Sequence, residues 1–103
     1  MIKMLILLER REDMTYDEFE EYYMEEHAPM VERMPNVERY VNDLPTDPGQ
    51  SAYDAVAELW FEDANALGAA FDSEAGQAVK ADAEEFVADR TTLIVEESVR
   101  FDR

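Results

Sequence analysis

The residues from Ile2 to Leu8 constrain the fold more than any other segment, because all of them except Lys3 are apolar. A run of this length and composition is typical of a strand that is buried on both faces of a sheet. A second segment, 53–61, alternates as a strand does. One of its faces is apolar throughout, and the opposite face carries apolar residues among its polar ones. The sequence therefore predicts a sheet whose two faces are both covered.

The signals for the first helical region lie between residues 15 and 34. Thr15 and Glu18 have the spacing of a capping box, which predicts a helix that begins after Thr15 and ends at about His27. Pro29 disfavours helical geometry at the residue before it. We therefore expect a break there, followed by a short second helix over 29–34.

Two further helices are predicted in the second half of the chain, each opened by an N-capping side chain. Asp63 is expected to cap a helix that ends at Phe71, and Ser73 a helix that continues to about Ala88. The predicted strands are 2–8, 37–42, 53–61 and 93–101. The order βαββαβ predicts one α+β domain over residues 1–103, a ferredoxin-like arrangement of four antiparallel strands with helices on one face.

That arrangement leaves one face of the sheet without a cover from the same chain. Val56 and Trp60 lie opposite the main apolar face of their strand, and the first strand is apolar on both sides. A second copy related by two-fold symmetry can pack its sheet against this face. We therefore expect a homodimer in which the two domains form a dimeric α+β barrel.

The charge of the chain excludes some partners and suggests an environment. Asp and Glu number 26 against 9 basic residues, for a formal net charge of −17. Nucleic-acid binding is not expected, because phosphate contacts need Lys and Arg. Self-repulsion of this size is screened in concentrated salt, which suggests a halophilic source. An acidic, disordered partner-binding segment is the rival interpretation, and the aromatic content of 11% with clear periodicity argues against it.

Targeting and cysteine signals point to the cytoplasm. The chain has no cysteine, so disulfides and thiolate chemistry are not expected. No signal peptide or membrane-spanning apolar run is recognisable, so we expect a cytoplasmic protein without a membrane partner.

His27 is the first candidate for chemistry, because it is the only histidine and the only side chain that ordinarily titrates near neutral pH. Phe19, Tyr23 and His27 follow one another at intervals of four, so they share one helix stripe. The alternative is that His27 only caps the last carbonyl groups of its helix.

Glu58 is the second candidate, because it shares a sheet face with Trp60 that is expected to be apolar and covered. The alternative is an exposed Glu58, or a pair with Arg39 or Arg100 across the sheet. Trp60 and Tyr40 could line an aromatic binding pocket, and the alternative is that they are ordinary core residues.

Nucleotide and metal sites are not expected. Three glycines in the whole chain leave no phosphate-binding loop, and one histidine without cysteine leaves no zinc site. We expect no cofactor and no metal, and a small-molecule ligand as the main partner besides a second copy of the chain.

Residues 19–29, which read FEEYYMEEHAP, resemble the F-x-x-Y-[WY]-x-x-x-H-[AG]-P signature of the EthD family, named for ethyl tert-butyl ether degradation. Further similarity lies in AELWF at 57–61, SEAGQ at 73–77, FVAD at 86–89 and VEE at 95–97. The resemblance implies a dimeric α+β barrel with His27 at the mouth of a cleft. Many members have Trp where this chain has Tyr23 and His where it has Ser98.

Members of the family are commonly labelled reductases or oxidoreductases, which implies an enzyme acting on a small apolar or aromatic metabolite. In that hypothesis His27 is a general acid or base and Glu58 orients it or the substrate. Phe19, Tyr23, Tyr40 and Trp60 would contact the substrate. Two alternatives stay open, a non-catalytic small-molecule binding protein and an accessory protein of an oxygenase or degradation system.

Overall fold

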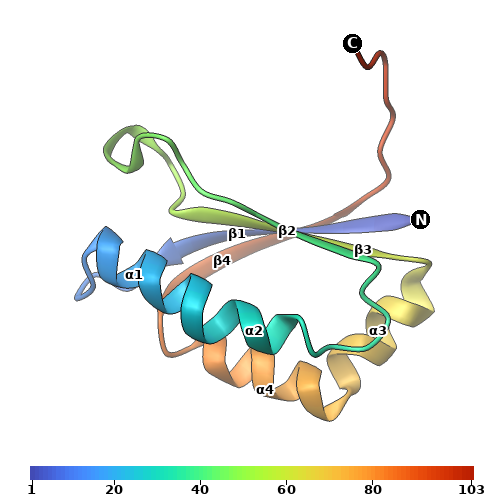
Figure 1. Ribbon diagram of the computed structural model, residues 1–103, viewed down its shortest axis with the longest axis horizontal. Coiled ribbons are helices and arrows are strands. Elements are labelled where there is room, and N and C mark those ends of the chain that lie inside the picture. Colours follow the sequence, from blue (N-terminus) through green and yellow to red (C-terminus); the bar gives the residue numbers. More distant parts are fainter.

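A computed structural model describes residues 1–103 and shows one sheet with one layer of helices (Figure 1). The strands are β1 (Ile2–Arg10), β2 (Arg39–Asp43), β3 (Ala55–Phe61) and β4 (Val87–Val95). The α-helices are α1 (Tyr16–Tyr22), α2 (Ala28–Val31), α3 (Ala64–Asp72) and α4 (Glu74–Ala83). A π-helical turn, η1 (Tyr23–His27), joins α1 to α2, and a short 3-10 helix, η2 (Pro48–Gln50), lies between β2 and β3.

The sheet has the strand order β2-β3-β1-β4, and every neighbouring pair is antiparallel. With two helical crossovers this is the predicted ferredoxin-like α+β fold. The most apolar strand, β1, has a neighbour on each side, so its backbone groups are fully paired between β3 and β4. The apolar run that dominates the sequence thus becomes an inner strand of the sheet.

The two faces of the sheet differ in what lies on them, and we call them the covered face and the open face. The four α-helices and η1 lie on the covered face, below the sheet in Figure 1. On β3 the buried residues alternate with half-buried ones, and the buried set faces the helices. Register places the apolar open-face residues next to one another: Leu5, Leu7, Val41, Val56, Leu93 and Val95. No helix of this chain covers them, as the sequence predicted.

The core lies between the covered face and the helices, in two clusters. Leu59 and Phe61 anchor one with α2, α3 and α4, and Phe19 and Phe86 anchor the other near the start of β3 and the end of α4. Both Phe61 and Phe86 are fully buried. Burial of each such side chain contributes about 1.5–3 kcal/mol, so these clusters hold the helices on the sheet.

The first helical region differs from its prediction, although the capping box forms as expected. The Glu18 backbone N–H donates to the Thr15 hydroxyl, and the Thr15 backbone N–H donates to the Glu18 carboxylate. The break expected before Pro29 is absent, because Ala28 keeps helical angles and its N–H donates to the carbonyl of Tyr23, five residues back. The wider π-helical turn accommodates the proline ring, so one bent helix runs where two were expected.

The α3–α4 hairpin follows its predicted caps. The side chains of Asp63 and Ser73 accept hydrogen bonds from the first turns of α3 and α4. At Gly76 the α4 backbone approaches α3 so closely that a Cβ atom there would lie 2.2 Å from the Ala70 carbonyl oxygen. Only glycine fits this contact without a backbone shift.

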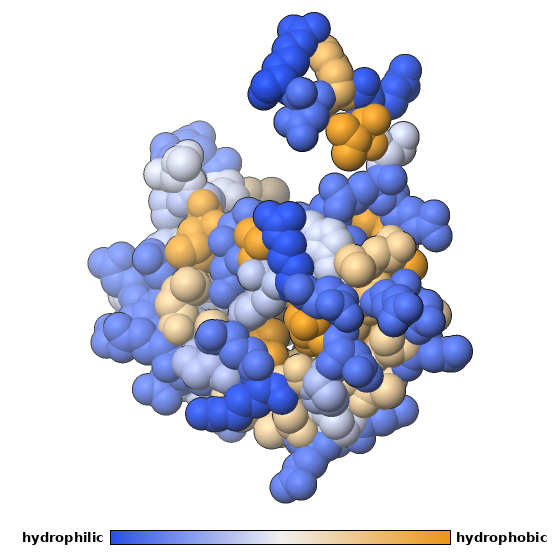
Figure 2. All heavy atoms as spheres, turned by 45° about the vertical axis from the view of Figure 1, so that its right-hand side comes forward, coloured by the Kyte–Doolittle hydropathy of each residue, from blue (hydrophilic) through white to orange (hydrophobic).

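The C-terminal part of the chain corrects the prediction. Helix α4 ends at Ala83 rather than near Ala88, and the last strand is residues 87–95 rather than 93–101. Val95 pairs with Lys3, near the start of β1, so the residues beyond Val95 have almost no strand left to pair with. The tail extends away from the domain, and Val99 and Phe101 are 70% and 68% exposed (Figures 1 and 2).

Hydrophilic residues cover most of the surface in the view of Figure 2, as a net charge of −17 requires. No helix in the structure combines the length and the apolar character needed to cross a bilayer.

Candidate functional site

His27 lies at the end of the π-helical turn and is 7% exposed, inside the covered face rather than at its rim. Its Nδ1 lies 2.8 Å from Oδ2 of Asp82 on α4. The Tyr22 hydroxyl donates to Oδ1 of the same carboxylate at 2.6 Å. Asp82 thus holds two side chains of the first helical region, and the imidazole is not a cap for the carbonyl groups of its own helix.

Asp82 and Tyr22 were not among the residues that the sequence singled out. Asp82 is one of 26 acidic residues and belongs to no motif, so its type and spacing gave no signal. Asp82 lies beside His27 only because α4 packs against η1. Tyr22 lies inside the segment that resembles the family signature, and that position was the one available hint.

The hydrogen bond to Asp82 determines which nitrogen of the imidazole carries the proton. A carboxylate only accepts, so Nδ1 carries a proton and Nε2 of the neutral ring has a free lone pair. Burial lowers the pKa of His27 below its ordinary value of 6.5, although the Asp82 carboxylate acts in the opposite direction. His27 is therefore neutral near pH 7 and able to accept a proton at Nε2. The same Asp82 contact raises the pKa of the Tyr22 hydroxyl to about 12.

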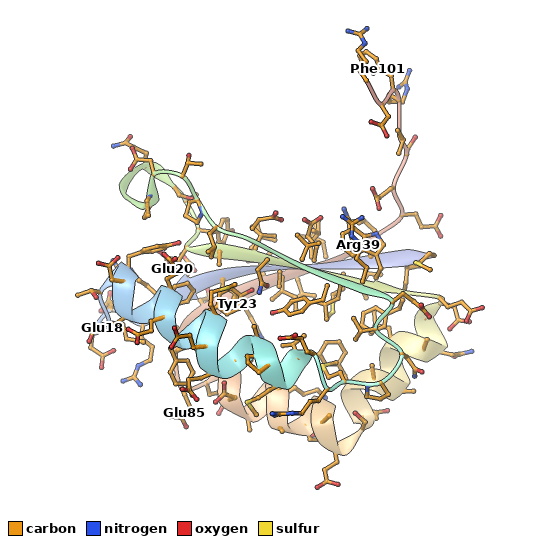
Figure 3. All side chains as sticks on the ribbon, viewed as in Figure 1. Glu18, Glu20, Tyr23, Arg39, Glu85 and Phe101 are labelled. Carbon is orange, nitrogen blue, oxygen red and sulfur yellow. The ribbon has the colours of Figure 1, made fainter.

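Aromatic rings surround the imidazole, and the predicted stripe is present. The ring centres of Phe19 and Tyr23 lie 5.7 Å apart, and those of Tyr23 and His27 lie 6.0 Å apart. Phe86, which follows α4, closes the cluster with its ring centre 4.8 Å from that of His27. Tyr23 points from the helix toward the sheet (Figure 3) and donates to the Asn42 side chain at 2.6 Å, which ties the stripe to β2.

A small apolar cavity, which we call the inner cavity, lies beside His27. Its volume is about 60 Å³. That is room for roughly four water molecules, at about 15 Å³ for each. Its lining residues come from every layer of the domain: Ile6, Leu8, Tyr23, His27, Val31, Tyr40, Ala57, Leu59, Phe71, Val79, Lys80, Ala83, Phe86, Val87 and Arg90. The Tyr40 hydroxyl is buried on this wall, close to the Tyr23 hydroxyl and the Asn42 side chain.

A more open hollow, the outer cleft, adjoins the inner cavity at the edge of the covered face. Its volume is about 290 Å³. Its lining residues are mainly apolar: Met4, Ile6, Leu67, Phe71, Lys80, Arg90 and Thr92. Four of these residues line both hollows, so the cleft and the cavity share a wall.

Glu58 and Trp60 lie elsewhere, on the open face, so the prediction that they share a cleft with His27 is wrong. Successive residues of β3 point to opposite sides, and the buried residues Ala57 and Leu59 take the side of the helices. Arg39, whose guanidinium lies 4.6 Å from the Trp60 ring centre, marks the same open face in Figure 3. The sheet itself separates Glu58 from the imidazole.

The Glu58 carboxylate pairs with Lys3 at 3.0 Å, rather than with either of the arginines considered from the sequence. Asp43 on the edge strand is its other neighbour. Sharing of a proton with Glu58 raises the pKa of Asp43 to about 6, while the contacts with Asp43 and Lys3 lower the pKa of Glu58. The open face therefore carries a second, separate group of titrating side chains.

The structure contains no group of three or more His, Cys, Asp or Glu side chains placed to hold a metal ion.

Comparisons with known proteins give the family and the fold. A sequence model of the EthD domain matches residues 11–90. An uncharacterised 11.0 kDa protein from the thcB–thcC intergenic region of Rhodococcus erythropolis is 37% identical over 80 residues, which cover 74% of this chain and 76% of that protein.

Solved structures with the same fold include an ethyl tert-butyl ether degradation (EthD) family protein from Bacillus halodurans C-125. It is 28% identical, covers 95% of this chain and 99% of its own, and has a TM-score of 0.82. A dimeric ferredoxin-like protein of unknown function from Thermobifida fusca YX is 17% identical, with coverage of 91% and 88% and a TM-score of 0.76. At that identity the likeness concerns the fold alone.

Proposed function

The chain belongs to the EthD family, and from this premise we propose that it is a small enzyme in which His27 removes a proton from an apolar or aromatic metabolite. The observation that carries the proposal is the contact of 2.8 Å between Nδ1 of His27 and Asp82, formed by a neutral, buried imidazole beside an apolar cavity. Asp82 is a positioning residue in this proposal, because it acts through His27.

The step is a proton transfer from the substrate to Nε2 of His27. The imidazolium that forms is stabilised by the Asp82 carboxylate on its other nitrogen. A positioned base of this kind contributes about 10²–10⁴-fold to rate. An oxidation at the site, as the oxidoreductase labels of the family imply, would need an external electron acceptor as a second substrate.

The surroundings favour an apolar or aromatic substrate. Twelve of the fifteen residues that line the inner cavity are hydrophobic. Tyr23 and Tyr40 lie on the cavity wall and are the substrate contacts in this proposal, whereas Phe19 lies behind Tyr23 and does not line the cavity. The inner cavity is smaller than the roughly 300–1,000 Å³ of typical ligand pockets, so a ligand must also occupy the outer cleft.

The test is deuterium wash-in from D₂O into a panel of aromatic carbon acids such as acetophenone and 1-indanone, followed by mass spectrometry. We expect His27→Gln to abolish wash-in. We expect Asp82→Asn to lower it by about tenfold or more and to shift its pH profile, because the imidazole loses the group that fixes its tautomer.

Glu84→Gln is the matched control, since Glu84 is an exposed carboxylate on the same helix end and contacts neither His27 nor Tyr22. Wash-in that persists in a folded His27→Gln variant would rule out the base.

A second candidate is binding without turnover, and the small inner cavity favours it. Such a protein would sequester a metabolite or hand it to an oxygenase. Saturable binding of panel members that tracks the cavity residues, without wash-in in any of them, would support this function.

We also propose that the functional unit is a homodimer formed through the open face. The apolar residues of that face have no cover from their own chain, and a second copy can cover them by two-fold symmetry. The similar protein from Thermobifida fusca is described as dimeric. Light scattering over a range of protein concentrations measures this assembly.

A further inference from the structure

We propose that the inner cavity and outer cleft bind the anion of an apolar or aromatic acid, with its carboxylate between Lys80 and Arg90. This inference rests on the proposed function in one respect, since it takes the ligand of the hollow to be the molecule on which His27 acts. It adds the charge of that ligand and the side chains that recognise it.

The first support is the charge of the lining. Lys80 and Arg90 each line both hollows, and no Asp or Glu lines either one. The chain has 26 acidic residues against 9 basic ones, so a lining with two cations and no carboxylate departs from the rest of the molecule. The surface hollows along α1, by contrast, are lined mostly by glutamates.

The second support is that both cations are free to bind. Neither side chain lies within 4.0 Å of a carboxylate oxygen, whereas Lys3, Arg10 and Arg11 are all paired. The Lys80 Nζ lies 6.0 Å from the Phe71 ring centre, at a wall common to cavity and cleft. Lys80 is half-buried and Arg90 is exposed, so each cation keeps some contact with water and is accessible to an incoming carboxylate.

The third support is the combination of charge with apolar surface. Ile6 and Phe71 stand beside the two cations, and the rest of the outer cleft is also mainly apolar. A guanidinium binds a carboxylate through two parallel hydrogen bonds, which fixes its orientation as well as its position. An amphipathic acid anchored in this way places its apolar part in the inner cavity, toward His27.

Arg90 also acts on the histidine directly, because its positive charge contributes to the lowered pKa of His27. A carboxylate bound to Arg90 compensates that charge and brings a negative charge near the imidazole. Binding of an acid should therefore raise the pKa of His27, and binding of a neutral molecule of the same shape should not.

The test uses phenylacetate and its neutral isostere phenylacetamide, with octanoate as a longer apolar acid. Isothermal titration calorimetry at fixed salt measures binding, and the proton NMR signals of the only histidine measure its pKa. We expect phenylacetate or octanoate to bind and raise the pKa of His27. We expect phenylacetamide to bind at least about tenfold more weakly than phenylacetate and to leave the pKa unchanged.

Arg90→Gln and Lys80→Gln should each weaken binding of the acids by about tenfold. Arg33→Gln is the matched control, because Arg33 is an exposed, unpaired arginine that lines neither hollow. Equal binding of acid and amide, an equal loss in the Arg33 variant, the same response to inorganic phosphate, or no binding of either acid would each overturn the inference.

His27→Gln separates this inference from the proposed function. That variant should keep its affinity for the acids within about threefold, since it retains both cations. Acid binding through Arg90 without wash-in would leave the ligand class standing and remove the base. Wash-in that needs His27, together with equal binding of acids and neutral molecules, would leave the base standing and remove the ligand class.

Discussion

Each face of the sheet carries a close contact between a nitrogen-bearing side chain and a carboxylate, but the chain covers only one of the two contacts. On the covered face, His27 and Asp82 meet at 2.8 Å under helices that exclude water. On the open face, Lys3 and Glu58 meet at 3.0 Å among apolar residues that this chain leaves uncovered. The difference teaches that one chain suffices to build the candidate active site, while the opposite face has no cover from the same chain.

The clearest way to break this comparison uses two consecutive residues, Phe61 and Trp60, which point to opposite faces. Phe61→Ala should lower the free energy of unfolding by about 3–5 kcal/mol at any protein concentration, because its cavity lies within one chain. Trp60→Ala should show a loss of that size only at concentrations where the dimer forms. Urea unfolding at a low and a high protein concentration measures both variants.

At low concentration Trp60→Ala should cost only about 1 kcal/mol, from the Lys3 and Arg39 contacts with its ring. A loss of the larger size that does not depend on concentration would place Trp60 in a core complete within the monomer.

A slightly smaller loss of stability tests the close packing of α3 and α4, the two helices that cover much of the covered face. Gly76→Ala should destabilise the domain by about 3 kcal/mol, because its Cβ atom would collide with the Ala70 carbonyl and force α3 and α4 apart. Gly68→Ala is the matched control in the neighbouring helix, where nothing lies within 4 Å of the added atom. It should stabilise the protein by up to about 1 kcal/mol through helix propensity. Thermal unfolding compares the two, and equal midpoints would contradict the close approach.

The smallest expected effect is a difference in the pH dependence of stability, and its sign differs between the faces. The folded pKa of His27 lies below 6.5, so between these two values the unfolded chain binds more protons and stability is lost as the pH falls. The folded pKa of Asp43 is raised from 3.8 to about 6, so in that window the folded chain binds more protons and stability is gained as the pH falls.

Urea midpoints near pH 7 and near pH 5 measure these contributions against the wild type. His27→Gln should lose less stability on acidification than the wild type, and Asp43→Asn should gain less. Glu62→Gln, which removes an exposed carboxylate in the turn after β3, should follow the wild type. The same response from the His27 and Asp43 variants would contradict the opposite signs.

The sequence predicted those parts of the fold that depend on local signals. The capping box at Thr15, the caps at Asp63 and Ser73, and the alternation along β3 are each decided by residues near one another in the chain. The order of these elements was enough to give the topology, and the apolar β1 was enough to identify an uncovered face.

The features that the sequence did not predict depend on distant contacts. Where β4 ends is set by the start of β1, more than ninety residues earlier in the chain, through the pairing of Lys3 with Val95. Asp82 becomes a partner of His27 only because α4 packs beside the π-helical turn. Glu58 was assigned to the wrong site, since sharing a strand with aromatic residues does not fix which face of the sheet carries the histidine.

The π-helical turn has a consequence for how this helix can change over evolution. A residue added to an α-helix advances every later side chain by about 100° around the axis, and the wide turn at residues 23–27 absorbs such an addition. Deleting one residue between Tyr23 and His27 should therefore restore an ordinary α-helix while the side chains that follow the turn keep nearly the same direction. The number of residues in this segment is therefore easier to change over evolution than in α3 or α4, where no such turn takes up the rotation that an added or deleted residue causes.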